Sequence, residues 1–256
     1  MLQKSDDTVD ALFGGKIKFV QSRKGYRISL DSVLLAHFIS VRAGERVMDL
    51  GTGNGILPLL LAFLYPSLSI TGVELQEAMV ARATRSVRLN RFDSRVNISC
   101  LDVCAVPDHF APGSFDAVIC NPPYRRSSSG RLSPNSEKQI ARHETRGTLE
   151  DFVHSAGHLL PLKGRLALIY SAVRCVDLLT AMRSNRIEPK RLQLIHSFAA
   201  GEASMVLTEG VRGGRPGIEI LAPLVVYDRQ GSYTAEVKRL LSGTVVNPPT
   251  SLRDES

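Results

Sequence analysis

The stretch Arg46–Leu57 reads Arg-Val-Met-Asp-Leu-Gly-Thr-Gly-Asn-Gly-Ile-Leu, an apolar run followed by glycines at alternate positions. Residues 47–50 predict a short buried strand, and the apolar residues 56–65 predict a helix. Glycines between a strand and a helix let the backbone turn sharply and come close to a ligand. We therefore expect a strand, a ligand-binding turn and a helix, around which the rest of an α/β fold is built.

The spacing of these glycines bears on the class of ligand. The dinucleotide fingerprint needs its third glycine at a position that Ile56 occupies here. Asp49 would also repel a pyrophosphate, whereas a carboxylate suits a ligand with an ammonium and a sulfonium, such as S-adenosylmethionine. A tight turn without any ligand is the alternative, and the turn alone does not decide between them.

Further strands and helices alternate along the rest of the chain. Strands are expected at 68–73, 96–101, 115–120, 165–170, 190–198 and 204–209, and helices at 29–39, 77–89, 148–160, 173–184 and 234–241. Together with 47–50 they predict an α/β fold with a Rossmann-like sheet of seven mostly parallel strands and helices on both faces. Short strands are also expected at 16–21 and within 218–227.

The same patterns divide the chain into three parts. Residues 1–42 are expected to form an N-terminal extension, mobile as far as residue 15 and then a strand and a helix that help to close the ligand pocket. Residues 43–242 hold the sheet. Residues 243–256 lack periodicity and are expected to be a disordered tail.

The charge of the chain favours a nucleic acid or another polyanion as partner. Lys and Arg number 32 against 25 Asp and Glu, which gives a formal net charge of +7. Basic residues gather in three stretches, 23–27, 125–146 and 212–215. The second is a long polar segment without hydrophobic periodicity, and loops of that length are usually functional or disordered. We expect it to be a substrate loop.

Several other classes of protein are disfavoured. No apolar run reaches the roughly 18 residues of a membrane span, and the N-terminus resembles neither a signal nor a transit peptide. We therefore expect a cytoplasmic protein without membrane association. The cysteines lack the paired spacing of a zinc site, so we expect buried free thiols and no metal: Cys100, Cys104, Cys120 and Cys175.

Two acidic residues stand where predicted strands end. Glu74 follows the strand at 68–73, at the position where an acid in a nucleotide-binding α/β unit hydrogen-bonds a ribose diol. Asp102 follows the strand at 96–101 and is placed to accept a hydrogen bond from an adenine amino group. The alternatives are a charge at the start of the next helix for Glu74 and an ordinary loop aspartate for Asp102.

The strand expected at 115–120 runs directly into Asn121-Pro122-Pro123-Tyr124. Because the carboxyl ends of parallel strands line the ligand crevice, this tetrapeptide should face the glycine turn. The prolines stiffen the backbone and remove donors. The carbonyls of Asn121 and Pro122 and the Asn121 side chain can then converge as acceptors beside the Tyr124 ring. This set fits a planar group that carries an NH₂.

Such an NH₂ is a poor nucleophile, because its lone pair is delocalised. Hydrogen bonds from its N–H groups to neutral acceptors orient it and relieve positive charge as it attacks a sulfonium methyl. The reaction needs in-line positioning rather than a strong base, so Asn121 suits it. A proline turn that merely closes the strand, with Tyr124 as packing, is the alternative.

These motifs together resemble class I S-adenosylmethionine-dependent methyltransferases that modify exocyclic or amide nitrogens. Gln21–Ala36 reads Gln-Ser-Arg-Lys-Gly-Tyr-Arg-Ile-Ser-Leu-Asp-Ser-Val-Leu-Leu-Ala. It is similar to the N-terminal signature of the bacterial tRNA1(Val) adenine-N6 methyltransferase family, and so is the stretch 209–217. The resemblance covers roughly residues 15–240, a span consistent with one domain. It implies the class I methyltransferase fold, S-adenosylmethionine as cofactor and N6-methylation of an adenine in a tRNA anticodon loop.

The resemblance also implies a role for each matched position. Catalytic residues that hold the target base would be Asn121, Pro122 and Tyr124. The cofactor would be bound by Asp49, Gly51, Gly53, Asn54, Gly55, Glu74, Asp102 and Asn121. Substrate contacts are expected from Pro123, Tyr124, Arg125, Arg126, Lys24 and Arg212. The run Arg-Ser-Ser-Ser-Gly at 126–130 departs from the family pattern, which leaves the specificity of the base-adjacent loop open.

Three alternatives stay open on the sequence. A protein glutamine-N5 methyltransferase of the release-factor type shares the tetrapeptide chemistry. An rRNA guanine-N2 methyltransferase would more often carry an additional domain. A catalytically idle RNA-binding protein with this fold would have no need of the acceptors at Asn121. The sequence does not indicate the oligomeric state.

Overall fold

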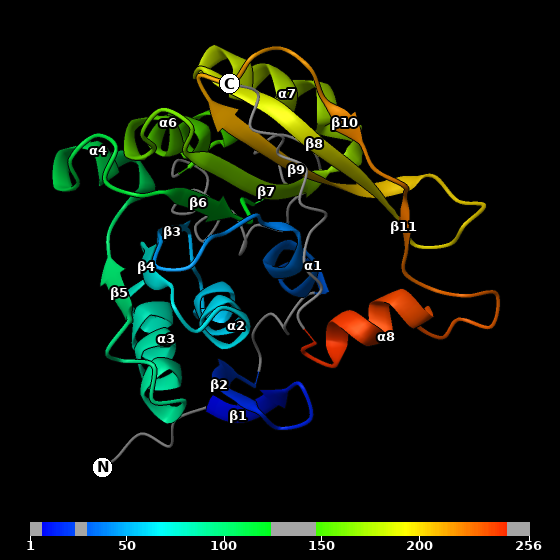
Figure 1. Ribbon diagram of the computed structural model, residues 1–256. Helices are drawn as coiled ribbons and strands as arrows, with labels where there is room; N and C mark the ends of the chain where they lie inside the picture. Colours follow the sequence, from blue (N-terminus) through cyan, green and yellow to red (C-terminus); the bar gives the residue numbers. More distant parts are fainter. Residues whose placement is uncertain (1–6, 24–29, 124–146, 245–256) are drawn as a thin grey trace, which may run out of the picture.

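The computed structural model describes residues 7–23, 30–123 and 147–244, in which one large sheet lies between two layers of helices (Figure 1). The strands are β1 (Asp7–Leu12), β2 (Ile17–Ser22), β3 (Arg46–Leu50), β4 (Ser69–Glu74), β5 (Val96–Cys100), β6 (Ala117–Cys120), β7 (Arg165–Ser171), β8 (Ile187–His196), β9 (Ala203–Arg212), β10 (Glu219–Ile220) and β11 (Leu224–Val225). The helices are α1 (Leu30–Phe38), α2 (Ile56–Leu64), α3 (Glu77–Leu89), α4 (Val106–His109), α6 (Leu149–Leu159), α7 (Cys175–Ser184) and α8 (Ala235–Leu241).

The strand order of the large sheet is β10-β8-β9-β7-β6-β3-β4-β5, and β11 also pairs with β8. Every pairing in this sheet is parallel except those of β9, which runs antiparallel to both β7 and β8. The expected sheet of seven mostly parallel strands is confirmed, with the two-residue strands β10 and β11 added along the outer edge of β8.

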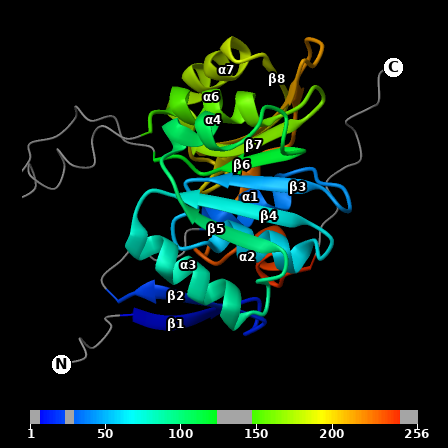
Figure 2. The same ribbon diagram turned by 90° about the vertical axis from the view of Figure 1, so that its left-hand side faces the viewer.

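Helices cover both faces of the sheet (Figures 1 and 2). On one face α1, α2 and α3 pack against the strands, and on the other α6 and α7 do so, with α4 packed against α6. Helix α2 has the sequence Ile-Leu-Pro-Leu-Leu-Leu-Ala-Phe-Leu and is buried along most of its length. Each fully buried leucine stabilises the fold by about 1.5–3 kcal/mol, so this helix anchors the face that carries the glycine turn.

The N-terminal strands form an antiparallel hairpin that packs on α3 (Figure 2). Arg82 Nε and Arg85 Nη1 donate to the Asp7 carboxylate at 2.9 and 2.8 Å, and the Arg82 hydrogen bond lowers the pKa of Asp7. The backbone N–H of Val20 donates to Ser86 Oγ at 2.8 Å. The expectation of mobility up to residue 15 is therefore wrong for residues 7–15, because contacts with a distant helix hold them.

Some expectations about the chain ends lie outside the described residues. These are the first residues of the N-terminal extension (1–6), the helix start expected at residue 29, and residues 245–256 of the tail. Within the described ranges no helix is long and apolar enough to cross a membrane.

All four cysteines are free thiols, as expected, but their burial differs from the expectation. Cys120 is buried and Cys175 is half-buried, whereas Cys100 and Cys104 are exposed. Cys100 is the last residue of β5, the edge strand, and Cys104 lies in the turn that follows it. The expectation of burial is wrong for these two because an apolar run at the edge of a sheet is covered on fewer sides.

A buried ion pair connects α1 to the antiparallel part of the sheet. Arg191 Nη1 of β8 donates to Glu209 Oε2 of β9 at 2.8 Å, and the two side chains are 3% and 0% exposed. The backbone N–H and the hydroxyl of Ser40, just beyond α1, also donate to this carboxylate, at 2.7 and 2.8 Å. The guanidinium lies 4.6 Å from the centre of the Phe38 ring. Glu209 therefore holds three segments together.

Glu209→Ala is expected to lower the free energy of unfolding by about 3–5 kcal/mol, because it leaves the buried Arg191 charge without its partner. Urea denaturation followed by circular dichroism measures this loss. The control is Arg183→Ala, which breaks the Arg183–Glu188 pair at the base of the same strand. Arg183 is 64% exposed, so that loss is expected to be about 1 kcal/mol or less. Equal losses in the two variants would contradict the role of Glu209.

Candidate active site

Three neighbouring strands of the sheet end side by side at one edge. Leu50 of β3 pairs with Val73 of β4 on one side and with Cys120 of β6 on the other. The next residues along these strands are Gly51, Glu74 and Asn121, which therefore occupy one row. From β3 the chain continues to β4 on one side, and it later returns to β6 on the other side. Ligands of open α/β sheets bind at such a switch point, outside the carboxyl ends of the strands. The sequence-predicted turn, acid and asparagine thus lie together.

Hydrogen bonds hold the glycine turn against β4. The backbone N–H groups of Gly51 and Thr52 both donate to the carbonyl of Val73 at 2.9 Å. The Glu74 carboxylate accepts from the N–H of Gly53 at 3.0 Å and from the N–H of Gln76, at the start of α3, at 2.9 Å. Glu74 therefore braces both the turn and the following helix. The contact with Gln76 corresponds to the alternative given for Glu74, a charge at the start of the next helix, whereas the sequence pattern did not indicate the contact with Gly53.

The glycines are needed because the turn is packed on one side. A Cβ on Gly51 would lie 3.0 Å from the Phe152 ring of α6, and a Cβ on Gly55 would lie 2.8 Å from Cβ of Ala83 in α3. At Gly53, where φ is +57°, no described atom lies within 4 Å of that position. The turn is thus closed toward the helices and open at Gly53, where a ligand can approach the backbone.

Asp49 is a fully buried carboxylate at the end of β3. Among the described residues neither of its oxygens has a hydrogen-bond partner. Burial raises the pKa of Asp49 to about 7, and the charge of Glu74 adds to this shift. The Thr52 hydroxyl opposes the shift, although its geometry falls short of a hydrogen bond. A buried carboxylate without a partner costs free energy, which a cationic group of a ligand would recover.

Two further buried oxygens near the turn have no hydrogen-bond partner among the described residues. They are Thr52 Oγ1 and Asn54 Oδ1. Buried polar groups in proteins are nearly always paired, so such exceptions call for an explanation. A positively charged amino group would match the charge of Asp49, and other donors of the same ligand would match the neutral oxygens. These residues therefore suit the amino-acid end of S-adenosylmethionine.

The remaining predicted residues at this edge lie on either side of β3. Asp102 follows β5 and caps a single 3-10 turn, since its Oδ1 accepts from the N–H of Cys104 at 3.0 Å. Asn121 is half-buried, Pro122 is buried and Pro123 is exposed. The other candidates, Lys24, Tyr124, Arg125 and Arg126, lie outside the described residues, as does the substrate loop expected after them.

Arg212 lies at the opposite edge of the sheet. It ends β9, and its neighbour Val211 pairs with Arg165, the first residue of β7. Its guanidinium donates to the carbonyl of Leu160, and its own backbone N–H donates to Gly164 at 2.9 Å. The structure therefore does not bring Arg212, an expected substrate contact, to the carboxyl edge, because β9 runs antiparallel and so ends where β7 begins.

Phe152 is a site residue that the sequence analysis missed. Its ring lies 3.0 Å from the Cβ position of Gly51 and 2.9 Å from that of Gly147, the first described residue after the substrate loop. The N-terminus of α6 is fixed by a capping box between Thr148 and Asp151, as the expected cap at Thr148 predicted. The Phe152 ring therefore packs against the glycine turn at Gly51. No local signal marks it, because it is one apolar residue on an amphipathic helix.

No group of three or more His, Cys, Asp or Glu side chains within residues 7–23, 30–123 and 147–244 is arranged to hold a metal ion. The polar atoms gathered at the carboxyl edge are carboxylate, amide and hydroxyl oxygens around a glycine turn. Their chemistry suits a ligand with amino and hydroxyl donors.

Comparison with known proteins adds independent findings. The model of the family described as methyltransferase small domain matches residues 24–183, more than half of the chain. The tRNA1(Val) (adenine(37)-N6)-methyltransferase of Porphyromonas gingivalis is 28% identical over 84% of this chain and 86% of its own length. The enzyme with the same name from Tolumonas auensis is 31% identical over 67% of this chain and 73% of its own length.

Solved structures share the fold. A predicted O-methyltransferase from Agrobacterium tumefaciens has a TM-score of 0.69 at 25% identity and covers 83% of this chain and 96% of its own. Geranyl diphosphate C-methyltransferase from Streptomyces coelicolor, in complex with S-adenosyl-L-homocysteine, has a TM-score of 0.52 at 16% identity and covers 71% of this chain and 78% of its own. The resemblance inferred from the sequence motifs is confirmed at the level of the family.

Proposed function

Because the chain belongs to the methyltransferase small domain family, it is an S-adenosylmethionine-dependent methyltransferase, and we propose that it methylates N6 of an adenine in a tRNA. One observation carries the proposal: Asn121 directly follows Cys120, beside the glycine turn and the buried Asp49. The curated relatives named tRNA1(Val) (adenine(37)-N6)-methyltransferases support position 37 of that tRNA as the target.

The proposed cofactor site uses the row of residues at the carboxyl edge. S-adenosylmethionine supplies the methyl group on a sulfonium. In our proposal Asp49 accepts from the amino group of the cofactor, and the open backbone at Gly53 lies against its methionine portion. Glu74, whose oxygens already accept from Gly53 and Gln76, uses remaining lone pairs for the ribose diol. Asp102 is assigned to the adenine amino group.

Asn121 is proposed to hold the acceptor nitrogen. Its side-chain carbonyl and the backbone carbonyl of Pro122, which has no N–H to interfere, accept the N–H bonds of the adenine amino group. Neutral acceptors orient the nitrogen and draw off positive charge as it attacks, and they do so without removing a proton beforehand. The proton leaves to water after transfer, because the methylated ammonium is strongly acidic.

The acceptor class is supported by charge and by relatives. An adenine amino group and a glutamine side-chain amide offer the same pair of donors, so Asn121 alone does not distinguish them. The formal net charge of +7 favours a polyanionic substrate, and the two relatives described above are tRNA enzymes by name. We therefore favour RNA over a protein acceptor.

A transfer assay at matched salt tests the acceptor class. The substrates are unmodified tRNA1(Val), the isolated anticodon stem-loop and a release-factor protein, each with a labelled methyl donor. We expect methyl incorporation into the tRNA, and nucleoside mass spectrometry should identify N6-methyladenosine at position 37. Label in the protein and in neither RNA would overturn the proposal in favour of a glutamine methyltransferase.

Glu74→Ala is expected to weaken S-adenosylhomocysteine binding by about 1–3 kcal/mol, measured by calorimetry. The variant loses the proposed acceptor for the ribose and also the brace on the N–H of Gly53. The control is Glu77→Ala, three residues along the chain at the exposed start of α3, which should bind like the unaltered protein. Unchanged affinity in Glu74→Ala would remove this residue from the cofactor site.

A further inference from the structure

Three aromatic side chains form a stack on the surface at the outer end of the sheet. Tyr227 and Tyr233 have ring centroids 5.3 Å apart with an angle of 14° between the planes, so the rings are stacked. Phe198 lies 5.6 Å from Tyr227. Phe198 is 49% exposed and Tyr233 is 37% exposed. We call Phe198, Tyr227 and Tyr233 the aromatic ladder.

Hydrogen bonds hold the two loops that carry the ladder. Tyr227 and Tyr233 lie opposite one another in an isolated antiparallel bridge. Between them Asp228 Oδ1 accepts from the N–H groups of Gln230 and Ser232 at 3.0 and 2.9 Å. The loop that carries Phe198 is tied to the first, since the N–H of Tyr227 donates to the carbonyl of Ser197 at 2.9 Å. The rings are therefore positioned in advance of any contact.

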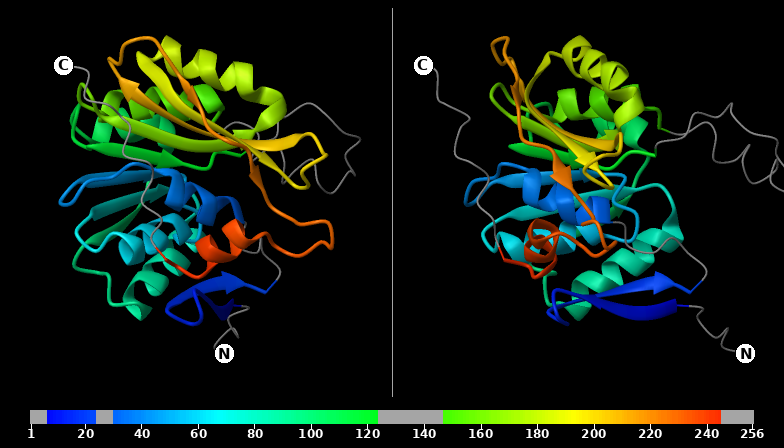
Figure 3. Two further views of the ribbon diagram at one scale, coloured as in Figure 1. Left: turned by 45° about the vertical axis from the view of Figure 1, so that its right-hand side comes forward. Right: turned by 90° about the vertical axis from the view of Figure 1, so that its right-hand side faces the viewer.

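The ladder lies at the same edge of the sheet as the active site. Strand β8 runs parallel to β7 and β6, because β9 is antiparallel to β7 and β8 alike. The turn after β8, which holds Phe198, therefore lies on the carboxyl side of the sheet, three strand spacings or about 14 Å to the side of β6. Strand β8 also extends to His196, four residues past Leu192, which is level with Cys120, so Phe198 lies roughly 15 Å farther out than Asn121 as well. In Figure 3 this turn and the 227–233 loop project on the same side of the molecule.

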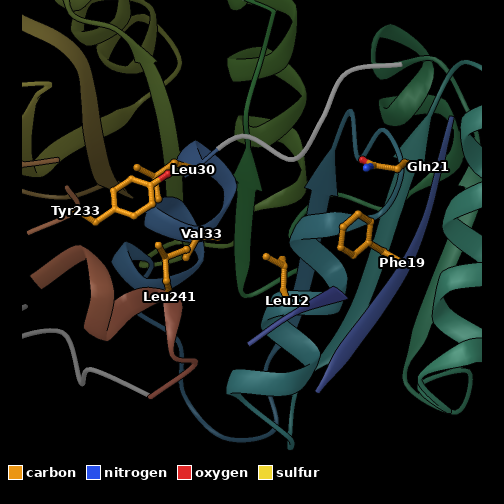
Figure 4. A pocket seen from close by; sticks show the side chains of 7 residues that line it. All are labelled: Leu12, Phe19, Gln21, Leu30, Val33, Tyr233 and Leu241. Carbon is orange, nitrogen blue, oxygen red and sulfur yellow. The ribbon is translucent and has the colours of Figure 1, made fainter. Parts of the chain in front are cut away.

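The ladder continues into an apolar groove of about 280 Å³ (Figure 4). Tyr233 lines the groove together with Leu30 and Val33 of α1 and Leu241 of α8. Charged side chains of both signs lie nearby along the chain, the basic Arg229, Lys238 and Arg239 and the acidic Glu202, Asp228 and Glu236. What distinguishes this surface is therefore its exposed ring faces, which suit flat unpaired bases.

We propose that the aromatic ladder binds unpaired nucleotides of the RNA substrate, a few nucleotides away from the one whose base is methylated. This inference rests on the proposed function. A base that enters an active site must leave its stack, which costs a few kcal/mol and is easiest in a single-stranded loop. Other bases of such a loop are unstacked as well, and aromatic side chains can stack on them. The ladder lies within a few nucleotides' reach of Asn121 and offers such faces.

Alanine substitution of the exposed rings measures the contribution of stacking. Phe198→Ala and Tyr233→Ala are each expected to weaken binding of unmodified tRNA1(Val) by roughly 5- to 150-fold. The salt dependence should keep its slope, because no phosphate contact is removed. Tyr233→Phe should bind like the unaltered protein. Leu162→Ala serves as the control, since Leu162 is 78% exposed at the opposite edge of the sheet.

The chain contains no tryptophan, so Phe198→Trp creates a single fluorescent reporter within the ladder. Its emission should be quenched when tRNA binds, whereas the emission of Leu162→Trp should not change. Unaltered tRNA affinity in both alanine variants, together with no quenching at position 198, would overturn the proposal. If the ladder variants lost methyl transfer to a release-factor protein while their affinity for tRNA stayed unaltered, the proposal would be overturned too, because the ladder would then bind a protein.

These outcomes separate the two proposals. If the unaltered protein methylates tRNA but the ladder variants bind it equally well, only the ladder proposal fails. If the unaltered protein neither binds nor methylates any RNA, the proposed function fails and the ladder proposal fails with it.

Discussion

Asp49→Asn is expected to reduce the affinity for S-adenosylhomocysteine by about 2–5 kcal/mol, the usual cost of removing one partner of a buried charge pair. The variant keeps the size of the side chain and loses the negative charge that we assign to the cofactor amino group. Calorimetry measures the affinity. The control is Asp116→Asn, because Asp116 directly precedes β6 at the opposite edge of the sheet, where it accepts from the N–H of Arg46.

The same substitution is expected to stabilise the protein without cofactor. The pKa of Asp49 is raised from 3.8 to about 7 in the folded protein. Between these values the unfolded chain holds fewer protons, so the stability of the unaltered protein falls as the pH rises. Above pH 7 the free energy of unfolding of the variant should exceed that of the unaltered protein by at most about 4 kcal/mol. The gain is limited because the buried amide also lacks a partner. Denaturation at pH 4 and pH 8 tests this, and the gain should vanish at pH 4.

The pKa of Asp49 also predicts how cofactor affinity varies with pH. Below pH 7 the carboxyl group of the cofactor-free protein binds a proton, which must leave when a cationic amino group binds. Affinity should therefore fall by up to about tenfold per pH unit below this point. Asp49→Asn should show a flat profile over the same range. A flat profile in the unaltered protein would contradict the pairing of Asp49 with the cofactor.

Asn121→Ala is expected to reduce the rate of methyl transfer at least about 100-fold, the effect of deleting one positioned polar group in an active site. Affinity for S-adenosylhomocysteine should stay within about threefold, a difference under 1 kcal/mol. The reason is that the side chain acts on the acceptor nitrogen. Single-turnover transfer to tRNA measures the rate.

Two variants accompany Asn121→Ala as comparisons. Asn97→Ala changes an exposed asparagine in the middle of β5 and should transfer methyl groups at the ordinary rate. Asn121→Gln keeps the amide but moves it by one methylene, so its rate should fall between the other two. A normal rate in Asn121→Ala would exclude this residue from the reaction.

Much of the central sheet could be predicted because its signals are local. The apolar run before Gly51, the helix start at Thr148 and the glycine spacing each report on neighbours within a few residues. The alternation of strands and helices then limits the topology. The sequence therefore predicts that Gly51, Glu74 and Asn121 lie together at the carboxyl ends of the strands.

Features that depend on distant segments could not be predicted in the same way. The hairpin at 7–22 is held by Arg82 and Arg85 of α3, and its own sequence shows only a weak alternation. Because β9 runs antiparallel, Arg212 lies at the opposite edge of the sheet from the site, and no residue in β9 indicates that direction in the sequence. That Asp49 has no hydrogen-bond partner among the described residues likewise depends on what surrounds it in three dimensions.

The position of β9 in the sheet determines the order in which the outer strands can pair. This strand lies between β7 and β8 although the chain makes it after both. A growing chain that ends before residue 203 has no β9 to pair with β8, and until residue 209 is made Arg191 lacks the carboxylate with which it is buried. The outer half of the sheet therefore closes late, from pairings between residues far apart, which is the slow kind of folding step. The aromatic ladder, built on the turn between β8 and β9, is completed only after that closure.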